Sequence, residues 1–447
     1  MNIVKLYWYI PILILIFGAG IILTIRLNGI QFRKLFVALK LMFRSSKKTN
    51  GQTSSFGALC ISLSATIGTG NIIGIAVATK LGGPGALFWM IIFSIFGLAT
   101  KYTEGFLAIK YRTLNNSTLT GGPFVYIEYG MGKKYKFLSI LYAIFGLLSA
   151  TLGIGTMTQS NGITDAFNNV FLNQSPIGIK IKASVIIGII IVIICGLVIF
   201  GGTKRVSKIC EFVIPFAASI YILTCLFIVI NHLHLLKDVI SLIFKTAFSF
   251  QSFTIGSSSF LFINAIIQGA QKGIFVNEAG LGSSAIALSC ADENDPSKQG
   301  LISMGSMFIT MVISIITGLV VIMMNSYLKD LNGINITNDA FINGLFVNKT
   351  IGSMILFICV LFFAITTIIG WSLYGVKCLN YLTNENKKLE KIYLIIYIIM
   401  VFIGAVIKVE TIWNISDICN ALMAIPNLIA LIYLSKVVKQ DLKEETT

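Results

Sequence analysis

Glycine and polar side chains interrupt two otherwise apolar segments of the chain, and the first interruption is Ala65–Asn71. Within it, Gly68 and Gly70 let a ligand approach the backbone closely, and a half-helix that starts here presents free N–H groups to a carboxylate. Thr69, Gly70 and Asn71 are therefore the predicted ligands of a carboxylate, with Asn71 as a side-chain donor. The alternative is that the glycines form a close helix-packing face.

The second interruption runs from Gln268 to Gly282 and carries Asn277 together with two charged residues, Lys272 and Glu278. Gln268 and Asn277 are predicted to complete the polar shell of the same site. Charges in apolar surroundings are costly unless they are paired or functional. Lys272 and Glu278 are therefore expected either to pair with each other or to form an inner gate.

Two further residues carry chemistry that suits a small zwitterionic ligand. Gln159, in the polar stretch Thr156–Asn161, could accept a hydrogen bond from an ammonium group, although a hydrated helix end explains it about as well. Trp371 could wall off a pocket and limit it to a small side chain, or it could be an ordinary core or lipid-facing aromatic. Both residues are assigned to the predicted ligand site with these alternatives open.

The composition determines the environment of these residues. Hydrophobic residues make up 56% of the 447, charged residues make up 12%, and the mean hydropathy is +0.87. In soluble proteins about a quarter of the residues are charged. Continuous apolar runs such as 183–200 are long enough to span a bilayer as helices, whereas membrane barrels consist of short alternating strands. The chain is therefore expected to be an all-α integral membrane protein.

Apolar runs bounded by glycine, proline or charged residues predict eleven membrane spans. Their bounds lie near 7–27, 55–79, 85–109, 137–165, 183–201, 207–231, 255–289, 299–325, 350–378, 391–408 and 411–435. The two interrupted segments open the first and second halves of the last ten spans. Such paired interrupted helices point to an inverted-repeat transporter whose substrate site lies between them. We expect one extra N-terminal helix followed by a core of five plus five helices.

The charges predict the orientation and the division of the chain. Lys and Arg number 34 against 18 Asp and Glu, and the predicted inside and outside segments share the cations 24 to 9. Because cations favour the cytoplasmic side, the N-terminus is expected outside and the C-terminus inside a cell (inner) membrane, and nucleic-acid binding is not expected. Residues 1–50 would hold the first helix and a basic amphipathic helix at 31–43, residues 51–435 the transporter core, and residues 436–447 a cytoplasmic tail. The polar segment 335–346 is either a short lid or an ordinary loop.

Ile67–Ala76, followed by Leu81–Met90, resembles the signature of the sodium:alanine symporter family, the alanine or glycine:cation symporters. Similar stretches extend over most of the chain, at Lys101–Glu104, Gly121–Ile127, Gly201–Arg205 and Lys272–Gly282. The resemblance implies an eleven-helix chain with a leucine-transporter-like inverted repeat. It also implies Na⁺-driven uptake of a small neutral amino acid, alanine or glycine, by alternating access.

The same resemblance implies an ion site. Thr366 and Thr367 look like oxygen ligands of Na⁺, together with backbone carbonyls near Ala65 and Gly68, since hydroxyl and carbonyl oxygens suit a hard cation. The alternative is that each threonine bonds back to its own helix. The partners implied are Na⁺, a small neutral amino acid and lipid. No cofactor is expected beyond Na⁺ as the coupling ion, and we expect a monomer.

Other classes of function explain the pattern less well. A channel would need a ring of charges or a repeated filter loop. An enzyme would need a constellation such as G-x-S-x-G or H-E-x-x-H, and the sequence contains neither motif and only two histidines. A cation symporter that is not an enzyme is therefore expected, with H⁺ in place of Na⁺ as the alternative coupling ion.

Overall fold

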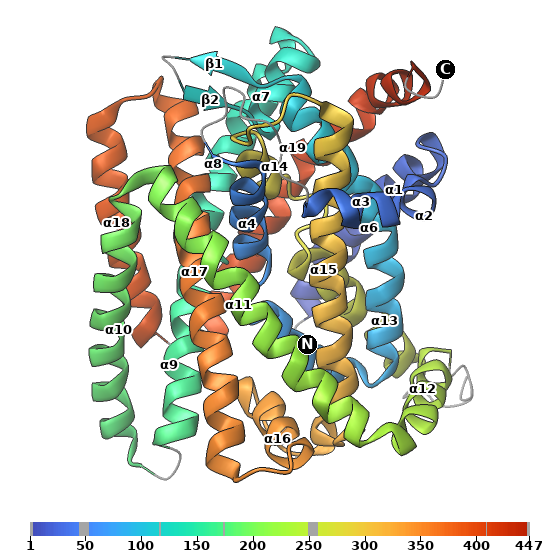
Figure 1. The fold of residues 1–447 in the computed structure, drawn as a ribbon, viewed down its shortest axis with the longest axis vertical. Coiled ribbons are helices and arrows are strands. Elements are labelled where there is room, and N and C mark those ends of the chain that lie inside the picture. Colours follow the sequence, from blue (N-terminus) through green and yellow to red (C-terminus); the bar gives the residue numbers. More distant parts are fainter. Residues whose placement is uncertain are drawn as a thin grey trace.

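The computed structural model describes residues 3–43, 53–115, 118–172, 175–248, 258–407 and 409–444. Within these ranges the chain is predominantly helical (Figure 1). The elements, in chain order, are α1 (Ile3–Arg26), α2 (Ile30–Arg33), α3 (Leu35–Met42), α4 (Ser55–Thr66), η1 (Gly70–Gly74), α5 (Ile75–Gly82), α6 (Gly85–Lys110), β1 (Thr113–Asn115), β2 (Thr118–Thr120), α7 (Pro123–Val125), η2 (Tyr126–Gly130), η3 (Lys133–Tyr135), α8 (Lys136–Leu152), α9 (Met157–Phe171), α10 (Ile177–Ile199), α11 (Gly202–Asn231), α12 (Leu233–Ala247), α13 (Ser258–Gln271), η4 (Lys272–Val276), α14 (Ser283–Leu288), α15 (Pro296–Met323), η5 (Ser326–Leu328), α16 (Ile334–Gly344), α17 (Lys349–Thr383), α18 (Lys387–Val406) and α19 (Val409–Glu444).

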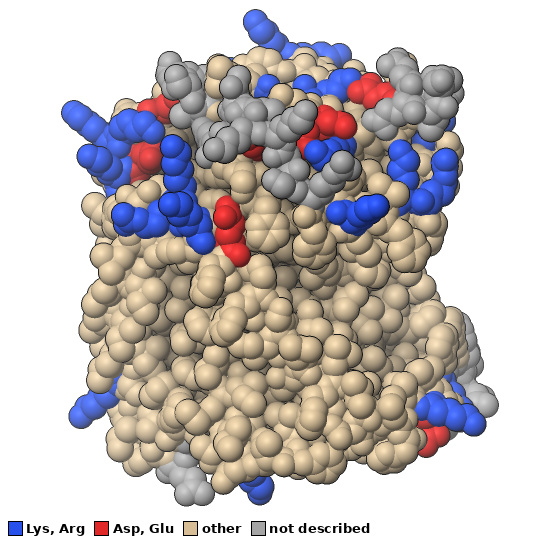
Figure 2. Space-filling view, in the orientation of Figure 1, with Lys and Arg blue, Asp and Glu red and all other residues tan. Residues whose placement is uncertain are grey.

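Long helices run between two ends of the molecule that differ in charge. Figure 2 shows Lys and Arg gathered at one end, a broad belt almost without charge in the middle, and few charges at the other end. The charged end carries the β1–β2 hairpin, α2 and α3, and we call it the basic end (Figure 1). The end that carries α12 and α16 is called the opposite end. An uncharged belt between two polar ends is the surface that a bilayer requires.

Eight helical segments within the described ranges are long and apolar enough to cross a membrane, or nine if the bent pair α4 and α5 counts as one span. The eight are 85–110, 133–171, 177–199, 202–231, 296–323, 349–383, 387–406 and 416–442. The other two predicted spans correspond to α1 (Ile3–Arg26) and to the short pieces α13, η4 and α14. The expected count of eleven therefore stays a prediction, as does the five-plus-five repeat.

The helices divide into a central pair and a lipid-exposed set. In α6 and α15, 67% of the residues in the membrane-spanning stretch are buried inside the protein. In α10 and α11 only 28% of them are buried. Large apolar side chains on these outer helices, among them Ile193 and Phe212, are exposed. A helix that is apolar all round and largely exposed is stable only against lipid. The packed core therefore lies around α6 and α15.

The first interruption breaks its helix as predicted. The side chain of Ser54 caps α4 by accepting a hydrogen bond from the Gly57 N–H at 2.8 Å, and α4 ends at Thr66. Ile67 and Gly68 lie outside the helix, which resumes as the short π-helical turn η1 and continues as α5. The second half is bent by 46° from the first. The break leaves backbone groups of both half-helices without their usual helical partners.

The second interruption breaks the chain only at Asn277–Gly282. Gln268–Gly273 is helical, within α13 and η4, so the prediction that the interruption begins at Gln268 was wrong. Gln and Lys are good helix formers, and polar character alone did not end the helix there. The break itself has positive φ at Glu278 (50°), Gly280 (85°) and Gly282 (72°). Glycine adopts this left-handed backbone readily, whereas Glu278 does so at a cost in free energy.

Several elements were not predicted. The β1–β2 hairpin and α7 follow α6 at the basic end, and the amphipathic helix α12 lies at the opposite end (Figure 1). The predicted span 137–165 is divided between α8 and α9 by a short irregular stretch after Leu152. The predicted amphipathic segment 31–43 is helical, as α2 and α3, and the polar segment 335–346 falls largely within the helix α16.

Candidate functional site

The first break is held by side chains of its own helix and of α9. The Gly68 N–H donates to Asn71 Oδ1 at 3.2 Å, and the Thr69 N–H donates to Gln159 Oε1 at 3.1 Å. In a continuous helix the Gly68 N–H would instead reach the Ser64 carbonyl, four residues back. The side chain of Asn71 therefore stabilises the break and leaves the Ser64 oxygen available to another partner.

Gly68 is required by close packing. A Cβ atom at this position would lie 2.9 Å from Thr367 Oγ1 and 3.0 Å from Gln159 Oε1. Carbon atoms rarely approach oxygen atoms so closely, so a larger residue fits only if the break or the Thr367 and Gln159 side chains move. The break thus lies in contact with both helices, and for Gly68 this agrees with the alternative reading of a close helix-packing face.

The two breaks meet on α15. Asn71 Nδ2 donates to Ser314 Oγ at 3.1 Å and lies 3.5 Å from the Thr310 carbonyl oxygen. The Thr310 hydroxyl donates to Asn277 Oδ1 at 2.8 Å, and Asn277 Nδ2 donates to Ser94 Oγ on α6 at 3.0 Å. Asn71 and Asn277 are both fully buried. The structure therefore brings these two predicted residues together, with their amides engaged by the helical framework.

The broken helices also face each other beyond these amides. A Cβ atom on Gly70 would lie 3.5 Å from the Val276 side chain, and one on Gly74 would lie 3.6 Å from Lys272 Nζ. The hydroxyl of Thr69 is buried and has no hydrogen-bond partner among the described residues. The two broken helices therefore contact each other at Gly70 and Val276, and the neighbouring Thr69 hydroxyl keeps a donor that no described residue uses.

Gln268 does not lie where the two broken helices meet. It is buried, and its Cβ lies 2.9 Å from the Cβ position of Gly82, at the end of α5. Gly82 follows Gly70 by twelve residues, which corresponds to about 18 Å along a helix. The structure therefore does not bring Gln268 together with the other predicted ligands, because the helix carries it toward the opposite end.

Gln159 and Trp371 do lie at the break. Gln159 Nε2 donates to the Ile154 carbonyl at 3.0 Å, so this amide holds the irregular turn between α8 and α9 as well as Thr69. Trp371 is fully buried, with its indole Nε1 3.4 Å from the Ala65 carbonyl oxygen and its ring packed edge-on against Tyr374. A hydrated helix end and a lipid-facing aromatic are thereby excluded for these two side chains.

The two threonines of α17 differ. The Thr367 hydroxyl lies 2.7 Å from the Ser64 carbonyl oxygen, 3.3 Å from that of Ile67 and 2.8 Å from that of Phe363. The Thr366 hydroxyl contacts only carbonyls of its own helix, at 2.8 and 3.0 Å. Thr367 therefore faces the first break, whereas Thr366 follows the alternative of bonding back to its helix. The carbonyl oxygens of the first break that lie near the Thr367 hydroxyl belong to Ser64 and Ile67. These residues directly precede Ala65 and Gly68, near which the ion-binding carbonyls were predicted.

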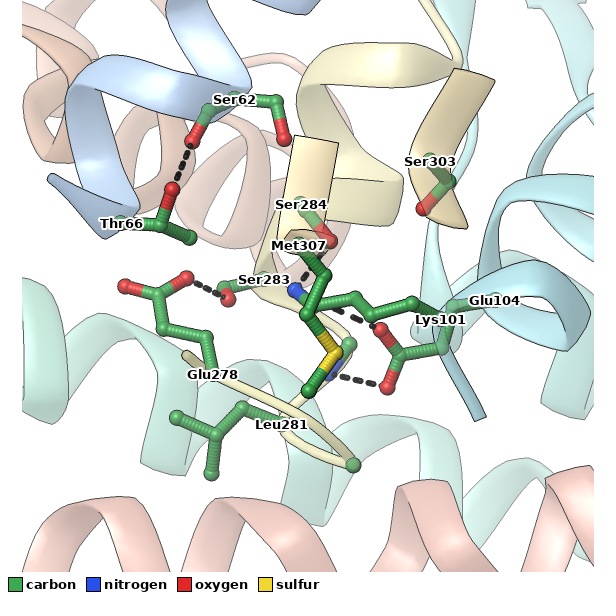
Figure 3. Close-up of polar contacts among 12 residues, drawn as sticks. Ser62, Thr66, Lys101, Glu104, Glu278, Leu281, Ser283, Ser284, Ser303 and Met307 are labelled. Carbon is green, nitrogen blue, oxygen red and sulfur yellow. Dashed lines mark hydrogen bonds and ion pairs between the residues drawn. The ribbon is translucent and has the colours of Figure 1, made fainter. Parts of the chain in front are cut away.

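A buried charge group lies at the second break (Figure 3). Lys101 Nζ is 3.8 Å from Glu104 Oε2 and donates to Ser284 Oγ at 2.7 Å. Glu104 Oε1 accepts from the Gly282 N–H at 3.0 Å and from Asn427 Nδ2 at 3.0 Å. Glu278 belongs to this group and interacts with Lys101. The charged neighbour of Lys272 is instead Asp417 on α19, so Lys272 and Glu278 do not form the pair that the sequence left open.

Each end of the site is covered. At the basic end, Thr53 pairs with the segment after α14, through Thr53 N–H to the Cys290 carbonyl at 3.3 Å and Asp292 N–H to the Thr53 carbonyl at 2.9 Å. At the opposite end, Thr337 on α16 donates to the Ile72 carbonyl of η1 at 3.0 Å. Of the two readings of the polar segment, a lid over the first broken helix agrees with this contact.

Comparison with known proteins agrees with these features. The model of the "Sodium:alanine symporter family" matches residues 1–446. An uncharacterised transporter of Haemophilus influenzae is 42% identical over 98% of this chain and 93% of its own length. The sodium/alanine symporter AgcS of Methanococcus maripaludis is 40% identical over 98% and 94%, and the probable sodium/glutamine symporter GlnT of Bacillus subtilis is 35% identical over 99% and 89%.

A solved structure of a Na⁺-coupled sialic acid symporter is also similar to this chain, at 15% identity and a TM-score of 0.48, over 92% of this chain and 81% of that one. The match to the family model covers nearly the whole chain, and so do the relatives. The chain therefore belongs to the sodium:alanine symporter family.

Proposed function

We propose that this protein is a sodium-coupled symporter that carries a small neutral amino acid, alanine or glycine, by alternating access. The observation that carries the proposal is the buried contact of two broken helices, at Gly70 and Val276, beside a Thr69 hydroxyl that has no hydrogen-bond partner among the described residues. Broken helices at membrane depth are stable only where they line a site or are otherwise buried in protein. Family membership supports the same class of function.

The carboxylate of the substrate would bind at the start of η1. N–H groups of the first turn after Thr69 point toward the break, and the positive end of the helix dipole favours an anion. The Thr69 hydroxyl adds a donor that has no competing partner among the described side chains. Asn71 contributes indirectly, because it fixes the break against Ser314.

Close packing around the first break favours a substrate with a short side chain. Gly70 faces Val276 at van der Waals distance, and a Cβ atom on Gly162 of α9 would lie 2.6 Å from the Thr69 side chain. Trp371 is buried beside the same break and closes it toward α17. The probable sodium/glutamine symporter GlnT of Bacillus subtilis is similar over nearly the whole chain, so glutamine is the competitor that tests this size limit.

The sodium ion would bind at Thr367. Its hydroxyl has one proton but lies within 2.8 Å of two carbonyl oxygens, those of Ser64 and Phe363. One proton cannot serve both contacts fully, so one close approach between oxygens remains unfavourable. A small hard cation between the Thr367, Ser64 and Ile67 oxygens would relieve it. Ala65, Gly68 and Thr366 are the chain neighbours of these three residues, and their backbone would form the surroundings of the ion.

We place the basic end at the cytoplasmic face of a cell membrane. The gathering of Lys and Arg there supports this orientation through the positive-inside rule (Figure 2). The N-terminus would then lie outside and the C-terminus inside, and one polypeptide would contain the complete site. The half-helices α4 and α14 would face the cytoplasm, and α5 and α13 would face outward.

Uptake into proteoliposomes tests the function. We expect saturable uptake of labelled alanine that an inward Na⁺ gradient drives and that glycine inhibits far better than glutamine does. The control replaces Na⁺ with K⁺ at equal ionic strength. Equal uptake with K⁺ would exclude sodium coupling, uptake driven by a pH gradient alone would favour H⁺, and stronger inhibition by glutamine would exclude the size limit.

A further inference from the structure

Glu278 is a buried carboxyl with incomplete hydrogen bonding. It lies in the second break, is fully buried and has a positive φ of 50°. Ser283 Oγ donates to its Oε2, whereas its Oε1 accepts no hydrogen bond within the described part of the chain. A buried polar atom without a partner is rare in proteins and calls for an explanation.

The charges around Glu278 do not balance if every group is ionised. The buried group contains one cation, Lys101, and two carboxyls, Glu104 and Glu278, and all three are at most 1% exposed. Glu104 has more of the partners of an anion, because the Gly282 N–H and Asn427 Nδ2 donate to its Oε1 and Lys101 Nζ lies 3.8 Å from its Oε2, although this Oε2 also accepts no hydrogen bond from the described residues. The cation is therefore taken, and an ionised Glu278 would be an uncompensated charge inside the protein, which costs several kcal/mol.

The remaining neighbours do not supply a counter-charge. Besides Lys101 and Glu104, the titratable groups that act on Glu278 are Tyr374 on α17 and Tyr142 on α8. Tyrosine is uncharged near neutral pH. The side chain of Trp371 also lies near Glu278 and carries no charge. The net charge that faces Glu278 is thus near zero.

We infer that Glu278 is a proton-binding site of the transport cycle, protonated in this closed arrangement and ionised when the basic end opens to water. The inference deepens the proposed function and rests on it for the coupling to transport. The step is a simple transfer in which the carboxylate gains one proton on closing and returns it to water on opening. No other reactant is needed.

The position of Glu278 explains how protonation would be linked to opening. The residue lies between Asn277, which holds the break to α15, and α14, and the segment that follows α14 pairs with Thr53. In Figure 3 its carboxyl lies on the side of Ser62 and Thr66 of α4, so it faces the other broken helix. Separation of α4 from α14 would admit water to the carboxyl and make ionisation favourable.

Infrared spectroscopy of the purified protein tests the protonation directly. We expect a C=O stretching band of a protonated carboxyl at neutral pH that is lost in Glu278→Gln and kept in the control Asp441→Asn, which removes a carboxyl paired with Lys110 at the basic end. Identical acid bands in the parent and Glu278→Gln would overturn the inference. If Glu278→Gln does not fold, Glu278→Asp replaces it, and an unshifted band would have the same meaning.

The link to transport has a separate measurement. A pH indicator in weakly buffered solution should report a proton change when Na⁺ and alanine are added to the parent and to Asp441→Asn, and none with Glu278→Gln. An equal proton change in Glu278→Gln would overturn the role of Glu278 in the cycle. A parent that binds no amino acid would contradict the proposed function, while the infrared band would still decide whether Glu278 holds a proton.

Discussion

Asn71 and Asn277, one from each broken helix, both contact Thr310 on α15. Asn71 Nδ2 lies 3.5 Å from the Thr310 carbonyl oxygen, and the Thr310 hydroxyl donates to Asn277 Oδ1 at 2.8 Å. A single residue of the central helix therefore touches the side chain that stabilises each break. Substrate and ion would bind beside these breaks. Movement of α15, or of one break, would therefore displace the other break through Thr310.

Removal of the Thr310 hydroxyl should destabilise the junction. Thr310→Val keeps the shape but leaves Asn277 Oδ1 buried without its donor, which costs about 1–3 kcal/mol. We expect a lower midpoint of thermal unfolding and weaker alanine binding. The control is Thr103→Val on α6, whose equally buried hydroxyl bonds only to the Ala99 carbonyl of its own helix. Equal losses in the two variants would contradict a special role of Thr310.

Gly68 should tolerate no side chain. In Gly68→Ala the added carbon would lie 2.9 Å from Thr367 Oγ1 and 3.0 Å from Gln159 Oε1, so the break must move away from both helices. We expect loss of Na⁺-dependent alanine binding in a protein that still elutes as a single species. Gly196→Ala on the lipid-exposed α10 is the control, since nothing lies within 4 Å of its added carbon. Unchanged binding by Gly68→Ala would place the ion and substrate elsewhere.

The sequence predicts the first break well because its causes are local. Glycine and polar residues are concentrated within Ala65–Asn71, and no longer-range information is needed to expect a broken helix there. Gln268 has the same polar character, yet it lies in a regular helix that carries it away from the break. Its position depends on where α13 ends, and that end is set by the backbone of Glu278 and the glycines after it.

Part of the buried charge group can be predicted from the sequence. Lys101 and Glu104 are three residues apart in an apolar span, and such residues lie on the same face of a helix. The spacing predicts an ion pair, which the structure contains at 3.8 Å. The contact of Glu104 with Gly282 could not have been predicted, because it joins two segments separated by 178 residues.

Thr366 and Thr367 should differ in their effect on sodium. Adjacent residues of a helix point about 100° apart, and only the packing of α17 decides which one faces α4. Thr367→Val removes an oxygen beside the Ser64 carbonyl, so we expect at least about tenfold weaker Na⁺ affinity, equivalent to about 1.4 kcal/mol. Thr366→Val removes only bonds to its own helix and should change the affinity little. A Na⁺ titration of alanine binding measures both, and the reverse order would move the ion to the other face of α17.

Arg112 should hold the basic end closed. Its guanidinium donates to the carbonyls of Ser289, Ala291 and Glu293 and to Asn294 Oδ1, at 2.6 to 3.2 Å, and thereby fixes the segment that pairs with Thr53. Lysine lacks the planar fork that makes several such bonds at once. Arg112→Lys is therefore expected to let this segment separate from α4 more often and expose it to water.

The thiol of Cys290 reports this opening, because it is buried in the same segment. A membrane-impermeant thiol reagent applied from the cytoplasmic side should label Cys290 several-fold faster in Arg112→Lys than in the parent. Cys290→Ser in the same background identifies the labelled residue among the other cysteines. Arg205→Lys is the control, because the guanidinium of Arg205 donates to the Leu197 carbonyl of the preceding helix α10, far along the chain from this segment. Faster labelling only from the outside would reverse the orientation, and unchanged labelling from both sides would show that Arg112 does not hold the closed end.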